Sequence, residues 1–287
     1  MSLGEKLNNE ATIRDLYINL MKKTLSASVY DESAWKILDP GKRYQSAGLF
    51  KRLSGLLKNL VIEKLGGRSI ILVKQNPFNL SDRVNGKDWP MFGYTMVGHK
   101  RLDNVQECVE SVLKNNVPGD FVETGSWRGG TTIFMRALLK AYNVVDRNVW
   151  VADSFEGLPT PKDEQDGPDL SSVDYLKVSL EQVKANFKRF DLLDPQVQFL
   201  KGWFCDTLPN APIDQIAILR LDGDMYSSTM DSLQNLYHRV SKNGYVIIDD
   251  YHSWPSCHQA VTDFRTENNI TSEIVTIDWT GAYWRVE

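Results

Sequence analysis

Cysteine is scarce in this sequence. The 287 residues include three cysteines, Cys108, Cys205 and Cys257, and no two of them have the CxxC spacing of a metal or redox motif. An odd number of widely separated cysteines argues against a disulfide framework and against a structural zinc site. It favours a reducing compartment, and we therefore expect a cytoplasmic protein.

Long apolar runs and an excess of positive charge are missing as well. No stretch of about 18 consecutive apolar residues occurs, as a transmembrane helix would need, and Met1–Leu16 is polar rather than signal-like. The 33 lysines and arginines are outnumbered by 37 aspartates and glutamates, which gives a formal net charge of −4. Because nucleic-acid binding usually requires a concentrated basic surface, we expect neither a membrane nor a nucleic acid as a partner.

Residues 1–90 are predicted to form a helical and lid segment. Apolar residues recur there at helix-face spacing, first at Ile13, Leu16, Leu20 and Met21 and again over residues 49–60. The stretch Gln75–Trp89 is rich in Asn, Pro, Asp and Gly and predicts a long loop, of the kind that closes over a catalytic site. We expect the N-terminal helices to pair subunits in a homo-oligomer.

Residues 91–287 have the pattern of an α/β domain. Helical segments separate five apolar runs, which are Phe121–Glu123, Val149–Ala152, Val197–Leu200, Ile216–Leu219 and Tyr245–Ile248. Two further strand-like runs, over residues 273–277 and 282–286, follow a last helix and are joined by a short link. This alternation predicts a mostly parallel seven-stranded sheet with an antiparallel terminal hairpin, the layout of the Rossmann-like class I methyltransferase fold.

The first candidate site follows the first of these strands. In Phe121–Gly130 the strand ends at Glu123, turns through Gly125 and opens a helix. Glycines allow a ligand to approach the backbone closely, and ligands of open parallel sheets bind beyond the carboxyl ends of the strands. The spacing matches neither the dinucleotide fingerprint GxGxxG nor a P-loop. A plain strand-to-helix turn is the alternative.

The second candidate is Asp153, which ends the run Val149–Ala152. A carboxylate in this position can accept both ribose hydroxyls of a nucleoside. The alternative is a helix N-cap. Together the two features predict a nucleoside cofactor, and they fit a nicotinamide dinucleotide and S-adenosylmethionine equally well.

Four carboxylates follow the next two strands. Asp222 and Asp224 come after the fourth predicted strand, and Asp249 and Asp250, with His252, come after the fifth. Packing these acids together without a cation would raise their pKa values and cost free energy. Oxygen ligands in this number suit Mg²⁺, which lowers the pKa of a bound hydroxyl. N-caps and solvated loop acids are the alternative.

Six motifs, in order, resemble those of the macrocin O-methyltransferase family, whose members methylate sugar hydroxyls of macrolides and related antibiotics. The matching stretches are Thr95–Gly98 with Arg101–Asn104, Val117–Gly130, Asp153–Pro159, Gly202–Phe204 with Thr207–Pro209, Leu221–Tyr226 and Ile248–Tyr251. The resemblance covers roughly Gly93 to the end of the sequence. It implies S-adenosylmethionine as methyl donor and a small hydroxylated molecule as acceptor.

The resemblance also implies roles for individual residues. The cofactor site would consist of Thr95, Met96, Glu123, Gly125, Ser126, Trp127, Gly129, Asp153, Ser154, Trp203 and Asp222. Asp153 would hold the ribose, and Trp203 would lie near the adenine. Mg²⁺ would be ligated by Asp222, Asp249 and Asp250. Asp224 would be the general base, with His252 as the other candidate.

Two other functions share part of this pattern. A nicotinamide-dependent oxidoreductase would have the first two features, but it gives no reason for the Asp249–Asp250 pair. A non-catalytic nucleoside-binding protein on the same fold would not need the four acids. We therefore predict Mg²⁺-assisted transfer of a methyl group from S-adenosylmethionine to a hydroxyl of a small natural product, such as a sugar or polyketide hydroxyl in secondary metabolism.

Overall fold

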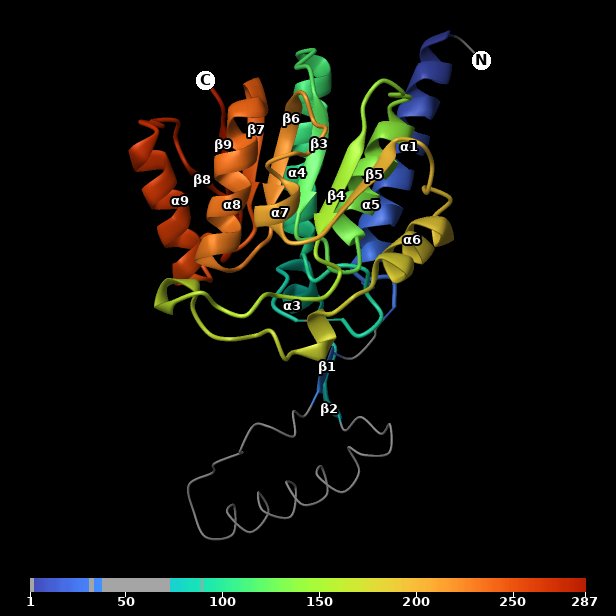
Figure 1. The fold of residues 1–287 in the computed structure, drawn as a ribbon. Helices are drawn as coiled ribbons and strands as arrows, with labels where there is room; N and C mark the ends of the chain where they lie inside the picture. The colour runs from blue at the N-terminus through green and yellow to red at the C-terminus, as the bar shows by residue number, and fades with distance from the viewer. Residues whose placement is uncertain (1–2, 31–33, 38–72, 89) are drawn as a thin grey trace.

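Five parallel strands form the centre of the sheet in the computed structural model, which describes residues 3–30, 34–37, 73–88 and 90–287 (Figure 1). The spatial order of the seven strands is β5-β4-β3-β6-β7-β9-β8, and β9 is antiparallel to both of its neighbours. The strands are β3 (Asp120–Thr124), β4 (Val149–Asp153), β5 (Val197–Lys201), β6 (Ile216–Leu221), β7 (Val240–Ile248), β8 (Val275–Thr276) and β9 (Ala282–Arg285). The predicted sheet and its terminal hairpin are confirmed.

The apolar runs become strands because both of their faces are buried. Every residue of β6 is buried. Successive side chains of a strand point to opposite faces, so Ile218 packs into one hydrophobic core and Leu219 into the other. In β3, Phe121 and Val122 are divided between the two cores in the same way.

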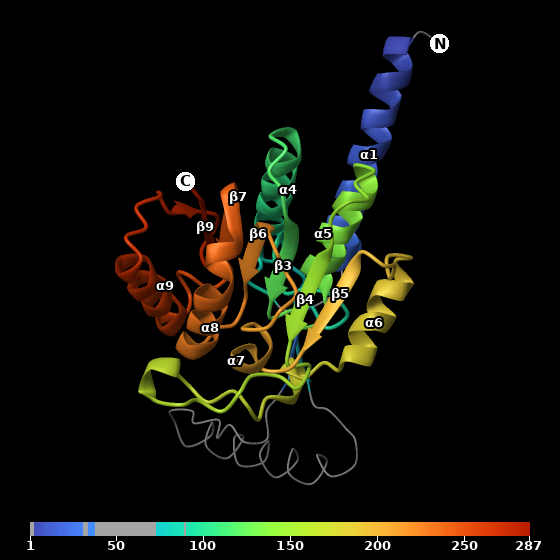
Figure 2. The same ribbon diagram turned by 45° about the horizontal axis from the view of Figure 1, so that its top comes forward.

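Helices cover both faces of the sheet (Figure 2). One face is covered by α1 (Leu3–Leu25), α4 (His99–Lys114), α5 (Gly130–Ala141) and α6 (Leu180–Arg189). The other is covered by α7 (Phe204–Thr207), α8 (Tyr226–Leu236) with the short η3 (Tyr237–Arg239), and α9 (Pro255–Glu267). Within the described ranges, no helix combines the length and the apolar character needed to cross a membrane.

The N-terminal segment shares a core with the rest of the chain. Helix α1 buries Ile18, Met21 and Leu25 among residues of α4 and α5. The Leu25 carbonyl accepts hydrogen bonds from the backbone N–H groups of Tyr94 (2.8 Å) and Thr95 (3.3 Å). The end of α1 is thereby fastened to the chain that leads into the sheet.

The loop predicted over Gln75–Trp89 is correct only in part. Strand β2 (Val73–Asn76) pairs with β1 (Ala34–Ile37) and extends into this stretch, and a short helix, α3 (Leu80–Val84), follows. The Asn79 side chain caps α3 by accepting hydrogen bonds from two backbone N–H groups, so a residue that signalled a turn begins a helix instead. The helix predicted over residues 49–60 lies outside the described residues.

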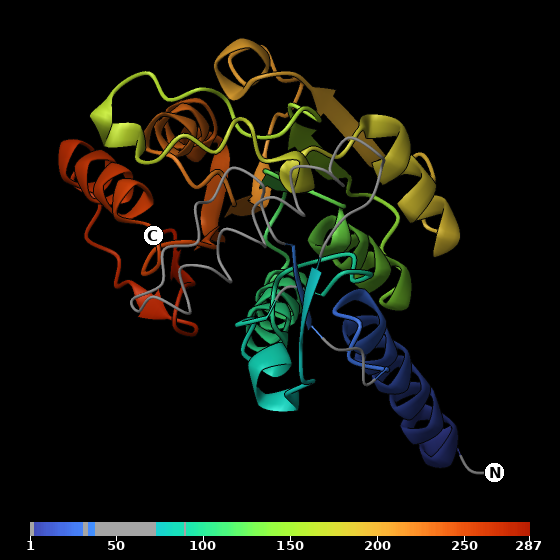
Figure 3. The same cartoon turned by 90° about the horizontal axis from the view of Figure 1, so that it is seen from below.

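The connection between β4 and α6 crosses the carboxyl edge of the sheet (Figure 3). It carries the short helices η1 (Glu164–Asp166) and η2 (Asp174–Leu176). Asp166 anchors it by accepting hydrogen bonds from the backbone N–H groups of Lys162 and of Ser227 at the start of α8, both at 2.7 Å. This connection forms one wall of the site described next.

Candidate active site

The turn after β3 lies directly against the turn after β6. Gly125 has a φ of +92°, and a Cβ at this position would lie 1.9 Å from the carbonyl oxygen of Asp222. Any side chain here would have to displace backbone, so the turn requires glycine. This close approach brings the glycine turn and Asp222 together at the carboxyl edge of the sheet.

Asp153 holds the glycine turn in place from the end of β4. Its Oδ2 accepts hydrogen bonds from the Ser126 N–H (2.7 Å), the Ser126 hydroxyl (3.1 Å) and the Trp127 N–H (3.3 Å). Its Oδ1 accepts one from the Phe155 N–H (2.7 Å). Burial raises the pKa of Asp153, and these hydrogen bonds act in the opposite direction. Since a carboxylate oxygen has two lone pairs, Oδ1 can still accept a hydrogen bond from a ligand hydroxyl.

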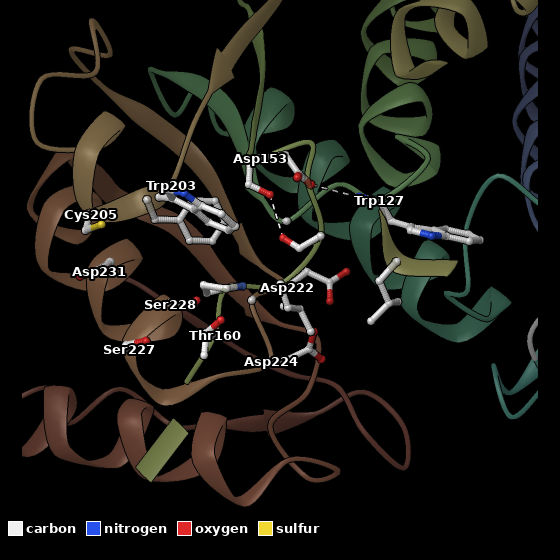
Figure 4. Close-up of a pocket in the computed structure, with 18 of the residues that line it drawn as sticks. Trp127, Asp153, Thr160, Trp203, Cys205, Asp222, Asp224, Ser227, Ser228 and Asp231 are labelled. Atoms are coloured by element: carbon white, nitrogen blue, oxygen red, sulfur yellow. Dashed lines mark hydrogen bonds between the residues drawn. The ribbon is translucent and has the colours of Figure 1, made fainter. Parts of the chain in front are cut away.

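A cavity of about 410 Å³ lies between these turns and the β4–α6 connection (Figure 4). Its volume is within the range of small-molecule sites in proteins. Eight of the predicted site residues line it, namely Met96, Gly125, Trp127, Asp153, Ser154, Trp203, Asp222 and Asp224.

Two tryptophans flank the acidic part of this cavity. In Figure 4, Trp203 and Trp127 lie on opposite sides of Asp222. Trp127 is fixed by a hydrogen bond from its Nε1 to the Tyr175 carbonyl (2.9 Å) and by the Arg128 guanidinium, 4.1 Å from the ring centroid. Flat apolar surfaces of this kind suit the stacking of a purine ring.

Three carboxylates gather at the ends of β6 and β7. Oxygen atoms of Asp222, Asp249 and Asp250 lie within 4.8 Å of one another. Asp249 is 6% exposed and Asp250 9% exposed. Burial, and then the charge of neighbouring carboxylates, raises the pKa of Asp222 and of Asp250. The acids are therefore closer together than their own charges favour.

Asp224 joins these carboxylates from the cavity. It has a φ of +56°, and its carboxyl group lies beside that of Asp250. Burial, and then the charge of Asp222, raises the pKa of Asp224 to about 7. A carboxyl group with such a pKa can exchange a proton near neutral pH.

Two buried arginines, which were not predicted as site residues, hold the acids together. Arg220 Nη1 donates hydrogen bonds to Glu123 Oε1 (2.5 Å) and Asp222 Oδ2 (2.9 Å), and its Nη2 donates to Asp249 Oδ1. Arg101 Nη1 donates to Asp249 Oδ2. Burial favours the neutral form of Asp249, but the two guanidinium groups outweigh it and lower its pKa.

The donor set fits a hard divalent cation. All the converging atoms are carboxylate oxygens, which Mg²⁺ prefers. Asp249 is already paired with two guanidinium groups, yet each of its oxygens keeps a lone pair for a further ligand. Burial, and then the neighbouring carboxylates, raises the pKa values of Asp222 and Asp250, and a bound cation would act in the opposite direction.

The remaining predicted residues lie around the cavity without lining it. Glu123, Ser126 and Thr95 are buried, and Gly129 is the N-cap of α5. Within the described part of the chain, Oε2 of Glu123 is buried without a hydrogen-bond partner. His252 is exposed, and its Nε2 lies 3.1 Å from the Thr276 hydroxyl. The structure therefore places Asp224 at the cavity and His252 outside its lining.

Sequence reasoning missed two groups of residues. Leu158, Leu176, Phe204, Ser227, Ser228 and Asp231 also line the cavity. Leu158 and Phe204 lie in stretches that resemble the family, but the resemblance assigned them no role, and the other four carry no distinctive pattern. Arg220 did carry a signal, because it is a charged residue within an otherwise apolar strand, and a buried charge requires a partner.

Comparisons with known proteins agree with this geometry. The family model for macrocin O-methyltransferase (TylF) matches residues 14–286. Demethyldecarbamoylnovobiocin O-methyltransferase of Streptomyces niveus is 45% identical over 275 residues, which is 94% of this chain and 93% of that protein. The 8-demethyl-8-(2,3-dimethoxy-alpha-L-rhamnosyl)-tetracenomycin-C 4'-O-methyltransferase of Streptomyces olivaceus is 45% identical over 282 residues, 95% of this chain and 93% of that protein. The solved structure of the O-methyltransferase NovP superimposes with a TM-score of 0.78 at 44% identity, covering 95% of this chain and 99% of NovP.

Proposed function

Because the chain belongs to the macrocin O-methyltransferase family and is an O-methyltransferase, we propose that it transfers the methyl group of S-adenosylmethionine to a hydroxyl of a small natural product, with Mg²⁺ in the site. The observation that carries this proposal is the position of Asp222, which lines the cavity and also belongs to the three-carboxylate cluster. A donor in the cavity and a hydroxyl beside the acids would therefore be neighbours.

The cavity walls suit the parts of the donor. S-adenosylmethionine supplies a methyl group on a positively charged sulfonium. Trp203 offers a surface for the adenine, and Oδ1 of Asp153 accepts a hydrogen bond from a ribose hydroxyl. The turn through Gly125 would border the methionyl part, and Met96 also lines the cavity.

The acid cluster suits the acceptor. Asp222, Asp249 and Asp250 would hold Mg²⁺, which when bound lowers the pKa of a hydroxyl near it. Asp224 takes the hydroxyl proton, because it is the acid that both lines the cavity and has a pKa near 7. Holding the two reactants in line accounts for a large part of the acceleration.

A sugar hydroxyl is the acceptor that we favour. The Streptomyces olivaceus relative is named as a 4'-O-methyltransferase of a rhamnosyl-tetracenomycin. At 45% identity over nearly the whole chain, this relative supports a glycosylated acceptor for the present protein as well.

Calorimetric titration tests the donor site. S-adenosylmethionine and S-adenosylhomocysteine should both bind with micromolar affinity, in Mg²⁺ and in EDTA, because Asp153 and Trp203, which would hold the nucleoside, are not among the proposed metal ligands. Asp153→Ala should weaken S-adenosylhomocysteine binding about 10- to 100-fold. The substitution removes a charged hydrogen-bond acceptor and the hydrogen bonds that hold the turn at Ser126 and Trp127.

Asp194→Ala is the matched control, because this acid also accepts backbone and side-chain hydrogen bonds but precedes β5 at the opposite edge of the sheet. Wild-type protein that binds neither nucleoside would overturn the proposed function. An Asp153→Ala variant with wild-type affinity would remove Asp153 from the donor site.

Helix α1 is proposed to pair two subunits. Ile13, Leu16 and Leu20 are 61%, 64% and 57% exposed and form an apolar stripe at helix spacing. Leu16→Glu should shift the protein from an oligomer to a monomer in size-exclusion chromatography with light scattering, because it buries a charge in the interface. Val145→Glu changes an equally apolar residue, 81% exposed in the α5–β4 connection, and should leave the mass unchanged. A monomeric wild-type protein would contradict the proposal.

A further inference from the structure

One guanidinium connects the donor cavity with the acid cluster. Arg220 lies on β6 in the middle of the sheet and is 1% exposed. Its hydrogen bonds reach Glu123 at the end of β3, Asp222 at the end of β6 and Asp249 at the end of β7. Three adjacent strands therefore place their terminal acids around a single side chain.

A second guanidinium holds Asp249 from the opposite side. Arg101 lies in the first turn of α4, and besides Asp249 it pairs with Asp278 in the β8–β9 hairpin through Nε (3.2 Å). Its side chain passes close to Gly86, where a Cβ would lie 2.6 Å from Nη2. Asp249 is thus oriented by two guanidinium groups, one on each carboxylate oxygen.

Lysine cannot replace these contacts, although it carries the same charge. The planar guanidinium presents several N–H donors in fixed directions and can therefore bind two or three carboxylates at once. A lysine ammonium is a point charge on a flexible chain, and it would leave at least one buried acid without its hydrogen bond. Replacement by lysine therefore separates the loss of orientation from the loss of charge.

We infer that Arg220 and Arg101 are positioning residues of the proposed reaction: both orient Asp249 as a ligand of the divalent cation, and Arg220 alone also orients Asp222, which lines the donor cavity, and Glu123, which is buried next to the glycine turn. The inference rests on the proposed function. It assigns different consequences to the two arginines, because Arg101 has no contact with Glu123 or Asp222 among the hydrogen bonds and ion pairs of the described residues.

The test is calorimetric titration of Mg²⁺ and of S-adenosylhomocysteine into full-length variants. Arg101→Lys should weaken Mg²⁺ binding about 10- to 100-fold, which is the usual effect of removing a residue that orients a metal ligand. Its affinity for S-adenosylhomocysteine should stay within about twofold of the wild-type value. Arg220→Lys should weaken Mg²⁺ binding equally and S-adenosylhomocysteine binding about tenfold. The reason is that hydrogen bonds to charged groups are lost both in the acid cluster, at Asp249, and on the donor side, at Asp222 and Glu123.

Arg136→Lys is the matched control. Arg136 is 5% exposed and donates three hydrogen bonds to Asp194, but this pair lies at the amino edge of the sheet. The Arg136→Lys variant should lose thermal stability and keep the wild-type affinities for Mg²⁺ and for S-adenosylhomocysteine.

Arg101→Lys with wild-type Mg²⁺ affinity, or Arg220→Lys with wild-type affinity for S-adenosylhomocysteine, would overturn the inference even if both variants melt at a lower temperature. Wild-type protein that binds no Mg²⁺ would overturn the proposed metal site and the inference with it. If Arg220→Lys does not fold, the Mg²⁺ affinity of Arg101→Lys decides whether the guanidinium groups orient Asp249.

Discussion

Asp250→Asn should reduce methyl transfer about a thousandfold and leave the affinity for S-adenosylhomocysteine unchanged. Asp250 belongs to the three-carboxylate cluster but does not line the donor cavity. Asparagine keeps the size of the side chain and removes its charge, so a cation bound to the cluster would lose one of its anionic ligands. A metal ion stabilises developing charge by several kcal/mol, and each 1.36 kcal/mol corresponds to a tenfold change in rate.

The rate would be measured with S-adenosylmethionine and with the acceptors named for the two Streptomyces relatives. EDTA should reduce the wild-type rate to a similar extent, and Mg²⁺ should restore it. Asp214→Asn is the control, because Asp214 is an exposed acid just before β6, at the opposite edge of the sheet. Full wild-type activity in EDTA would defeat the metal proposal.

Asp224→Asn should lower kcat by about 10²- to 10⁴-fold, the range for loss of a general base, whereas His252→Asn should change it less than about threefold. Both residues were candidates for the base. Asp224 lines the cavity and has a pKa raised to about 7, which keeps it basic enough to accept a proton and mostly ionised above that pH. His252 is exposed and lies against the Thr276 hydroxyl.

Single-turnover rates above pH 7 measure this difference directly, because they exclude product release. S-adenosylhomocysteine affinity should remain within a few-fold in both variants, which shows that the cavity is intact. The reverse pattern, with His252→Asn inactive and Asp224→Asn active, would move the base to His252.

The layout of the sheet could be predicted from the sequence because it depends on local patterns. Strands buried on both faces need uninterrupted apolar runs, and these runs, such as Ile216–Leu219, are visible without any knowledge of the fold. Parallel strands also end at a common edge, so Asp153, Asp222 and Asp249 could be assigned to one region from their positions after strands. Short-range capping was harder to predict: Asn79 signals a turn and a helix start equally well, and α3 was missed for that reason.

The contacts among those residues depend on the tertiary structure. Asp153 was predicted as a ribose ligand, and the fold also uses it to hold Ser126 and Trp127, a pairing between residues that are 27 and 26 positions apart. The cluster was predicted as four acids that need a cation, and the fold supplies two guanidinium groups from β6 and α4 before any metal binds. Residue type and strand order thus determined which charges reach the carboxyl edge of the sheet. Only the packing of α4, the hairpin and three strand ends decided which charges pair, because the strength of a buried ion pair depends on distances and burial that separate segments create together.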